Sequence, residues 1–278
     1  MPGWFGWLGV RGVEILRSPR EIGQMRKAGL LVWEAFQIAR AMVRPGVATA
    51  EIDLAIERFY AERQAEPLFK YYPNSTEGGL PFPAVTCISL NREVVHGIPG
   101  KRKLVEGDIV SIDTGCKLNG WCGDAAATFA VGEVPTRTRQ LLTVTRDVLH
   151  LAVSLMGQRK WWSEVAEEMQ NHVRKAGFSV VEDFVGHGIG RSMHEDPQVP
   201  NFVKRGYRRS RNDFRLVPGL VIAVEPMVNM GTKEVRVTTD QWTQVTVDGQ
   251  PSAHFEHTIA VTESGSQVLT AGPNGESW

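Results

Sequence analysis

The stretch Asp108-Ile-Val-Ser-Ile-Asp113-Thr-Gly-Cys-Lys-Leu-Asn119-Gly120-Trp-Cys-Gly-Asp124-Ala125 holds two β-type runs around Asn-Gly. Asn-Gly between such runs is the strongest short-range signal for a β-hairpin. With Asn119-Gly120 as the loop, Asp113 pairs with Ala126. Asp124 lies two residues from Ala126 on the second strand, so it shares a sheet face with Asp113 as its diagonal neighbour.

Two carboxylates on one face of a mostly apolar hairpin repel each other. Their repulsion raises one pKa unless a proton or a cation lies between them. A single aspartate in a strand is ordinarily a turn residue or a strand-end charge. The shared face of Asp113 and Asp124 instead favours a site for a divalent metal ion.

Apolar periodicity on both sides of this hairpin predicts helices and short strands. Ser18-Pro-Arg-Glu21 has the form of a capping box with proline at the first helical position, so a helix begins here and ends before Pro45. The other predicted elements are helices over 50–64, 136–156 and 163–176, a loop over 65–83, and strands over 84–90, 108–116, 121–131, 178–185, 219–225, 233–238, 242–247 and 252–262.

The pattern of two helices followed by strands occurs twice along the chain. This repetition indicates two structurally similar halves of roughly 120 residues each. No linker rich in proline and serine separates the halves, so the pattern predicts one domain. The expected fold class is α+β, with helices covering a curved antiparallel sheet.

Composition excludes several classes of protein. The 278 residues are 42% hydrophobic and 22% charged, which excludes disordered and fibrous chains. Lys plus Arg and Asp plus Glu both number 31, so the net charge favours neither nucleic acid nor an anionic membrane, and any basic surface must be local. No apolar run is long enough to span a membrane. The ten apolar residues at the start lack the basic region of a signal peptide, and three cysteines without a C-x-x-C favour the reducing cytoplasm.

Further candidate ligands follow the hairpin. His187 and His194 lie in a glycine-rich segment that is typical of a ligand-binding loop, although each alone is more often structural. Glu225 precedes a proline at the end of an apolar run, and Glu256 begins another. Carboxylates with a single imidazole suit Mn, Fe or Co at two adjacent positions. This set comprises Asp113, Asp124, His187, Glu225 and Glu256.

At these residues the chain resembles the type I methionine aminopeptidases, which are pita-bread metallopeptidases. The resemblance runs from Ile15 to Leu269 and is carried by motifs that follow the family order. These motifs are Val94-Val-His96-Gly-Ile-Pro99, the spacing of Asp113 and Asp124, Gly186-His-Gly-Ile-Gly190 with His194-Glu195, Val224-Glu-Pro-Met-Val-Asn229, and Phe255-Glu-His-Thr258.

The resemblance implies a pita-bread fold. It also implies an enzyme that removes the N-terminal methionine from nascent chains and prefers a small second residue. Such an enzyme would be cytoplasmic and monomeric. It implies two divalent ions (Co, Mn, Fe or Zn) that activate a bridging water. Asp124 and Glu256 would bridge both ions, His187 and Glu225 would serve one, and Asp113 the other. Glu225 would also move the proton, while His96 and His194 would contact the substrate. Four residues would line the methionine pocket, with core packing as the ordinary alternative: Phe82, Cys87, Met193 and Trp242.

The expected domain boundaries follow from the extent of the resemblance. They are an N-terminal arm over 1–14, one catalytic domain over 15–270 and a C-terminal tail over 271–278. The sequence departs from the family where Met193 replaces the usual aromatic residue and where 71–83 is longer, which leaves the pocket shape open.

A basic stretch from Lys204 to Arg215, with Tyr207 among the cations, is a further departure from the family. It is either a solvated loop or a contact to ribosomal RNA.

Two other functions remain open. One is a proline-specific peptidase of the same fold, although such relatives usually carry a separate N-terminal domain. The other is a non-catalytic pita-bread protein that binds ribosomes or RNA. Proteins of that kind, and the creatine-hydrolysing branch, typically lose ligands, whereas all five are present here.

Overall fold

The computed structural model describes residues 15–277, so the predicted arm over 1–14 lies outside the described residues. All four predicted helices are confirmed, with boundaries within two or three residues of the prediction. Ser18 begins the first helix through the predicted capping box, because its Oγ accepts from the Glu21 N–H while its own N–H donates to the Glu21 carboxylate. The helices are α1 (Pro19–Met42), α2 (Thr49–Glu62), α3 (Thr136–Met156) and α4 (Trp162–Lys175).

The strands form one curved nine-stranded sheet and two small three-stranded sheets, and the pairings within the described residues are antiparallel. In the large sheet the order is β1-β4-β5-β14-β9-β7-β8, with β2 beside β4 and β15 beside β14. Its strands are β1 (Glu66–Pro67), β2 (Cys87–Leu90), β4 (Ile109–Leu118), β5 (Trp121–Ala130), β7 (Gly186–Gly188), β8 (Glu195–Val199), β9 (Val221–Val224), β14 (Glu256–Thr262) and β15 (Gly265–Val268).

The small sheets flank this sheet. They contain β13 (Ser252–His254), β10 (Met227–Asn229) and β6 (Ser179–Val180) in one, and β11 (Val235–Val237), β12 (Gln244–Thr246) and β3 (Glu93–Val95) in the other.

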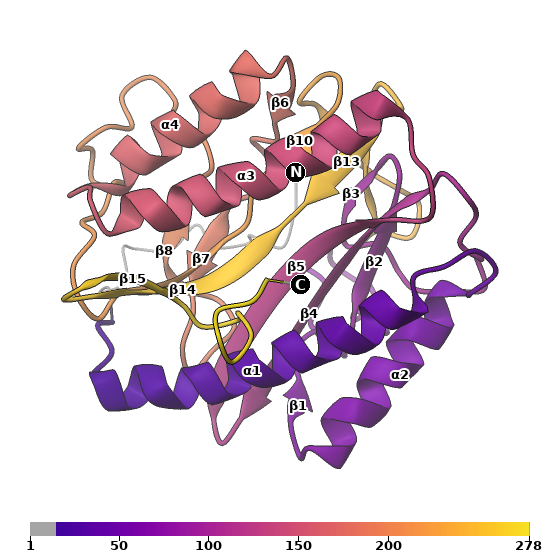
Figure 1. Ribbon diagram of the computed structural model, residues 1–278, viewed down its shortest axis with the longest axis horizontal. Helices are drawn as coiled ribbons and strands as arrows, with labels where there is room; N and C mark the ends of the chain where they lie inside the picture. The colour runs from indigo at the N-terminus through magenta and orange to yellow at the C-terminus, as the bar shows by residue number, and fades with distance from the viewer. Residues whose placement is uncertain (1–14, 278) are drawn as a thin grey trace.

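The helices lie in two pairs in front of the sheet, α1 with α2 and α3 with α4, and β14 passes between the pairs (Figure 1). The α+β class and the antiparallel sheet covered by helices are confirmed. Gly29 of α1 and Gly123 of β5 let the helix lie directly on the sheet, since a Cβ on Gly123 would stand 2.7 Å from the Gly29 nitrogen. The helices therefore cover one face of the sheet and leave the opposite face for polar side chains.

The β4–β5 hairpin has the predicted register, with Asp113 opposite Ala126. Alternation along β4 sends Ile112 and Cys116 toward the helices, where the Cys116 thiol approaches the Ala28 carbonyl. Asp113 consequently points to the uncovered face. Asp124 reaches the same face two residues before Ala126.

Several strand predictions were wrong in extent. The run 178–185 contains only the two-residue β6, and 252–262 divides at Phe255 into β13 and β14. The glycine-rich segment is only partly a loop, because Gly186–Gly188 forms strand β7, while residues 189–194 form the predicted loop up to β8. A Cβ on Gly188 would lie 2.1 Å from the Asp196 carbonyl oxygen, so close backbone packing requires the glycine. Sequence reasoning missed the short strands β1, β3, β8, β10 and β15.

The helices within residues 15–277 include none that is long and apolar enough to cross a membrane. The three cysteines are buried and unpaired. The predicted tail after residue 270 is held to α1, because the Arg26 guanidinium donates to the carbonyls of Leu269 (2.7 Å) and Gly272 (2.6 Å).

Candidate metal centre

Three carboxylates meet where β4, β5 and β14 lie side by side. Ala126 on β5 pairs with Asp113 on one side and with Glu256 on the other. Asp124 lies two residues before Ala126 on β5, on the same face of the sheet. Its position is fixed because its backbone N–H donates to the Thr258 hydroxyl (3.1 Å), which donates to the Asp124 carbonyl (2.8 Å). The sheet register therefore places the three side chains on one face at neighbouring positions.

His187 and Glu225 complete the group from the next two strands. His187 on β7 pairs with Ala223 of β9, and Glu225 follows the last residue of β9. The distance from His187 Nε2 to Glu225 Oε1 is 3.6 Å. His187 Nδ1 lies 2.9 Å from the Gly188 carbonyl and must donate to it, so the lone pair of the neutral ring is on Nε2. That tautomer is the one a metal-ligating histidine requires.

The geometry of this set fits a divalent cation. Ligand atoms of Asp124, His187 and Glu256 all lie within 4.8 Å of one another. Three buried oxygens have no hydrogen-bond partner: Oδ1 of Asp113, Oδ1 of Asp124 and Oε1 of Glu256. Buried carboxylate oxygens without donors are costly in a folded protein unless a cation neutralises them. Hard oxygen donors with one imidazole match Mn, Fe, Co or Zn.

Burial and mutual repulsion change the pKa values of this group. Burial raises the pKa of Asp124 to about 8. Burial, followed by the charges of neighbouring carboxylates, raises the pKa values of Asp113, Glu225 and Glu256 well above their usual range. Burial lowers the pKa of His187 to about 4, which keeps its imidazole neutral near pH 7. Such a cluster is unstable with all its charges unless cations are present.

The two predicted substrate-contacting histidines border the same cavity as all five ligand candidates. The His194 and His187 rings meet edge to face with centroids 4.4 Å apart. His96 packs edge to face on Phe184 and has a left-handed backbone, with φ of 61°.

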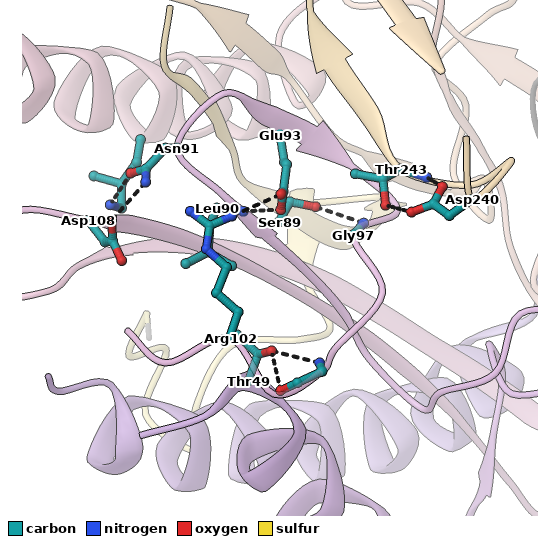
Figure 2. A network of polar contacts seen from close by, with 12 residues as sticks. Thr49, Ser89, Leu90, Asn91, Glu93, Gly97, Arg102, Asp108, Asp240 and Thr243 are labelled. Atoms are coloured by element: carbon teal, nitrogen blue, oxygen red, sulfur yellow. Dashed lines mark hydrogen bonds and ion pairs between the residues drawn. The ribbon is translucent and has the colours of Figure 1, made fainter. Parts of the chain in front are cut away.

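Polar contacts tie down the chain before and after His96, including a hydrogen bond from Gly97 to Ser89 (Figure 2). The Gly97 N–H donates to the Ser89 hydroxyl (3.0 Å) and the Leu90 N–H to the Glu93 carboxylate (2.7 Å). On the other side the Thr243 hydroxyl donates to Asp240 (2.6 Å) and lies 3.4 Å from the His96 carbonyl. The network thus connects the His96 segment to the loop that carries Trp242.

The four predicted pocket residues pack together in one buried apolar cluster beside this cavity. Trp242 meets Phe82 edge to face at 5.2 Å, and its indole N–H donates to the Leu80 carbonyl (3.0 Å). Phe69 belongs both to this cluster and to the cavity wall, so the cluster adjoins the ligand candidates. Its buried members are Phe69, Phe82, Ala84, Cys87, Met193 and Trp242.

Sequence reasoning missed several residues at the site, including Phe69, Val95 and Met227 of the cavity wall. Tyr72 bonds His194, and Phe184 lines the cavity. His254 Nε2 lies 3.8 Å from Glu225 Oε2. The length of 71–83 was a signal for Tyr72, and the place of His254 two residues before Glu256 was a signal for that residue. Neither signal identifies a contact, because the partners are far apart in the sequence.

The basic stretch Lys204 to Arg215 is an ordered, exposed turn built around buried Asp213. Asp213 accepts from the Ser163 hydroxyl (2.7 Å) and from the Arg209 N–H (2.7 Å). Arg208 lies 3.3 Å from Glu167, an exposed pair worth little in water. All six basic side chains of the stretch are exposed.

Comparison with known families and proteins gives a consistent result. The model of metallopeptidase family M24 matches residues 23–263. Methionine aminopeptidase 1 of Bacillus subtilis is 44% identical over 256 residues, which cover 92% of this chain and 98% of that protein. A methionine aminopeptidase of Clostridium perfringens is 43% identical over the same shares of the two chains.

Solved structures agree with the sequence matches. The crystal structure of a methionine aminopeptidase from Thermotoga maritima superposes with a TM-score of 0.85 at 40% identity, covering 93% of this chain and 99% of that one. A prolidase from Pyrococcus furiosus superposes with a TM-score of 0.71 at 21% identity, covering 93% of this chain and 66% of that one. The second likeness concerns the fold alone, which both proteins share with this chain.

Proposed function

Since the chain belongs to metallopeptidase family M24, we propose that it is a metal-dependent aminopeptidase that hydrolyses the N-terminal methionine of nascent proteins and peptides. One observation supports this most strongly. Five ligand candidates and two histidines surround one cavity, and an apolar cluster adjoins it. The relatives named as methionine aminopeptidases match almost the whole chain, whereas the likeness to proline-specific enzymes is confined to the fold.

Two divalent ions per chain are proposed as the cofactor. The residues that would hold them are Asp113, Asp124, His187, Glu225 and Glu256. When bound, such ions lower the pKa of a shared water and polarise the scissile carbonyl. The unpartnered oxygens of Asp113, Asp124 and Glu256 support this assignment. Co, Mn, Fe or Zn would suit these donors.

The protein's own side chains perform the remaining chemistry in this proposal. Glu225 lines the cavity together with the other ligand candidates, and its carboxylate would accept a proton and deliver it to the leaving amine. His96 and His194 border the cavity as hydrogen-bond donors for the substrate carbonyl oxygen and its tetrahedral intermediate. Phe82, Cys87, Met193 and Trp242 would hold the methionine side chain.

Peptide hydrolysis tests this proposal directly. Metal-stripped protein resupplied with Mn, Co, Fe or Zn is expected to release methionine from Met-Ala-Ser and to leave Gly-Pro peptides intact. The Asp113→Asn variant is expected to lose this activity, because one proposed ligand is gone. Hydrolysis of the Gly-Pro peptide alone would instead identify a proline-specific enzyme, and inactivity on both peptides would identify a binding protein.

Location, assembly and domain limits are proposed together with the function. We place the enzyme in the cytoplasm as a monomer, with nascent N-termini as partners and without DNA. The three buried, unpaired cysteines support a reducing compartment. Residues 15–270 form the proposed catalytic domain, and the family match to 23–263 supports these limits. Residues 1–14 and 271–278 are the proposed arm and tail.

The basic turn from Lys204 to Arg215 is proposed as a transient contact to ribosomal RNA. Its exposed cations support an electrostatic contact, which salt would weaken. The protein is expected to co-sediment with ribosomes at low salt. Reversing the charges of Arg205, Arg208 and Arg211 should reduce the bound fraction, whereas reversing Arg40 and Arg44 at the end of α1 should not. Equal sedimentation of both variants would show that the turn is only solvated.

A further inference from the structure

Tyr72 contacts His194 in two ways at the edge of the cavity. Its hydroxyl oxygen lies 2.7 Å from His194 Nδ1. The two rings also meet at 87° with centroids 5.4 Å apart, which is an edge-on contact. Burial raises the pKa of the Tyr72 phenol, so the hydroxyl keeps its proton and is able to donate it in a hydrogen bond.

The backbone around Tyr72 is fixed by a narrow loop that begins and ends at the pocket. The Phe82 N–H donates to the Tyr72 carbonyl (2.9 Å), and the Tyr71 N–H donates to the Phe82 carbonyl (2.8 Å). The Tyr72 N–H donates to the Phe69 carbonyl (2.9 Å). Farther along the loop, the indole N–H of Trp242 binds the Leu80 carbonyl. The Tyr72 ring itself packs against the apolar cluster, so the hydroxyl has little freedom to move.

A neutral imidazole has one N–H donor and one acceptor nitrogen. If Nδ1 accepts from a hydroxyl, the proton of the ring must be on Nε2. A proton on Nε2 makes that nitrogen the donor, whereas the other tautomer would present a lone pair there. Only the donor can stabilise negative charge that develops on a carbonyl oxygen.

We propose that Tyr72 is a positioning residue whose hydroxyl donates to His194 Nδ1 and so holds the ring in the tautomer that carries its proton on Nε2, the form in which that nitrogen can donate to a substrate. This inference rests on the proposed function for its kinetic consequence, although the tautomer itself can be observed independently. It assigns Tyr72 a role beyond lining an apolar pocket. The long loop 71–83 would then serve catalysis by fixing this hydroxyl.

Tyr72→Phe removes only the hydroxyl and keeps the ring. We expect kcat for Met-Ala-Ser to fall about 10-fold, the cost of one lost hydrogen bond, while KM changes less than about twofold. Tyr71→Phe is the matched control, because Tyr71 is the adjacent tyrosine, 73% exposed and outside the apolar cluster, and it should retain full activity. Introducing Tyr72→Phe into a His194→Ala background should cause no further loss, since the hydroxyl then has no ring to orient.

A spectroscopic experiment tests the tautomer without reference to activity. Long-range ¹H–¹⁵N correlation of histidine-labelled, zinc-loaded protein should show the Nε2–H form for His194, identified by its absence in His194→Ala. The Tyr72→Phe spectrum should shift toward a mixture of tautomers, and the Tyr71→Phe spectrum should not. An Nδ1–H form in the wild type, or an unchanged tautomer in Tyr72→Phe, would overturn the inference.

The two proposals fail in different ways. Wild-type protein that hydrolyses no methionyl peptide would refute the proposed function and leave the tautomer measurement valid. Active wild type with equal losses from Tyr72→Phe in both backgrounds would refute only the role of Tyr72. Melting temperature and bound metal, measured for each variant, separate these results from misfolding.

Discussion

Replacing Glu256 by glutamine is expected to lower kcat/KM for methionine release by at least about 1,000-fold, which corresponds to about 4 kcal/mol of transition-state stabilisation. Glu256 is 2% exposed and its Oε1 has no hydrogen-bond partner. The amide has nearly the same shape, so the change removes a charge and a proposed metal ligand without opening a cavity. Elemental analysis of the purified variant should also show a loss of bound metal.

The same substitution is expected to stabilise the metal-free protein. Burial and three neighbouring carboxylates raise the pKa of Glu256, so its charge is unfavourable when no cation is bound. Glu263→Gln is a suitable control, because Glu263 is exposed in the turn after β14 and should change neither activity nor metal content. Full activity in Glu256→Gln, or normal metal content, would contradict the proposed ligand set.

Metal-free protein should lose stability as the pH rises from about 6.5 to 8. Burial gives Asp124 a folded-state pKa of about 8, and the pKa values of Asp113, Glu225 and Glu256 are also raised. In this window the folded chain holds protons that the unfolded chain has released, so the free energy of unfolding falls with rising pH. One such proton over this range is worth about 2 kcal/mol.

Buried histidines act in the opposite direction at lower pH. Burial lowers the pKa values of five of them, so the unfolded chain binds protons below pH 6.5 that the folded chain does not. The carboxylates and the histidines affect the free energy of unfolding in opposite directions between about pH 4 and 6.5. Above pH 6.5 only the carboxylates change it. The histidines are His96, His187, His194, His254 and His257.

Urea unfolding of stripped and zinc-loaded protein at several pH values measures this effect. The stripped protein should become less stable above pH 6.5, and added zinc should remove the decline by neutralising the carboxylates. Glu256→Gln should show a shallower decline without metal. A flat profile for the stripped wild type between pH 6.5 and 8 would mean that burial does not raise the pKa values of these carboxylates.

Local patterns predicted much of this molecule. The capping box at Ser18 and the apolar periodicity gave all four helices, and the Asn-Gly turn gave the register of β4 and β5. Helices and hairpins depend on contacts between residues close in sequence, which a single chain displays directly. Three-residue strands such as β3 and β10 escaped prediction, because their backbone partners come from distant segments.

The site, like the fold, was predicted in part from the sequence and in part only shown by the tertiary structure. The sequence alone determined the fold class, the placement of Asp113 and Asp124 on one sheet face, and the set of candidate ligands. Only the tertiary structure decided that Ala126 has Glu256 as its other neighbour and that the Tyr72 hydroxyl meets His194 Nδ1. Those contacts join residues 130 and 122 positions apart. They arise from packing of the whole sheet, and packing at such separations leaves no periodic signal in the chain.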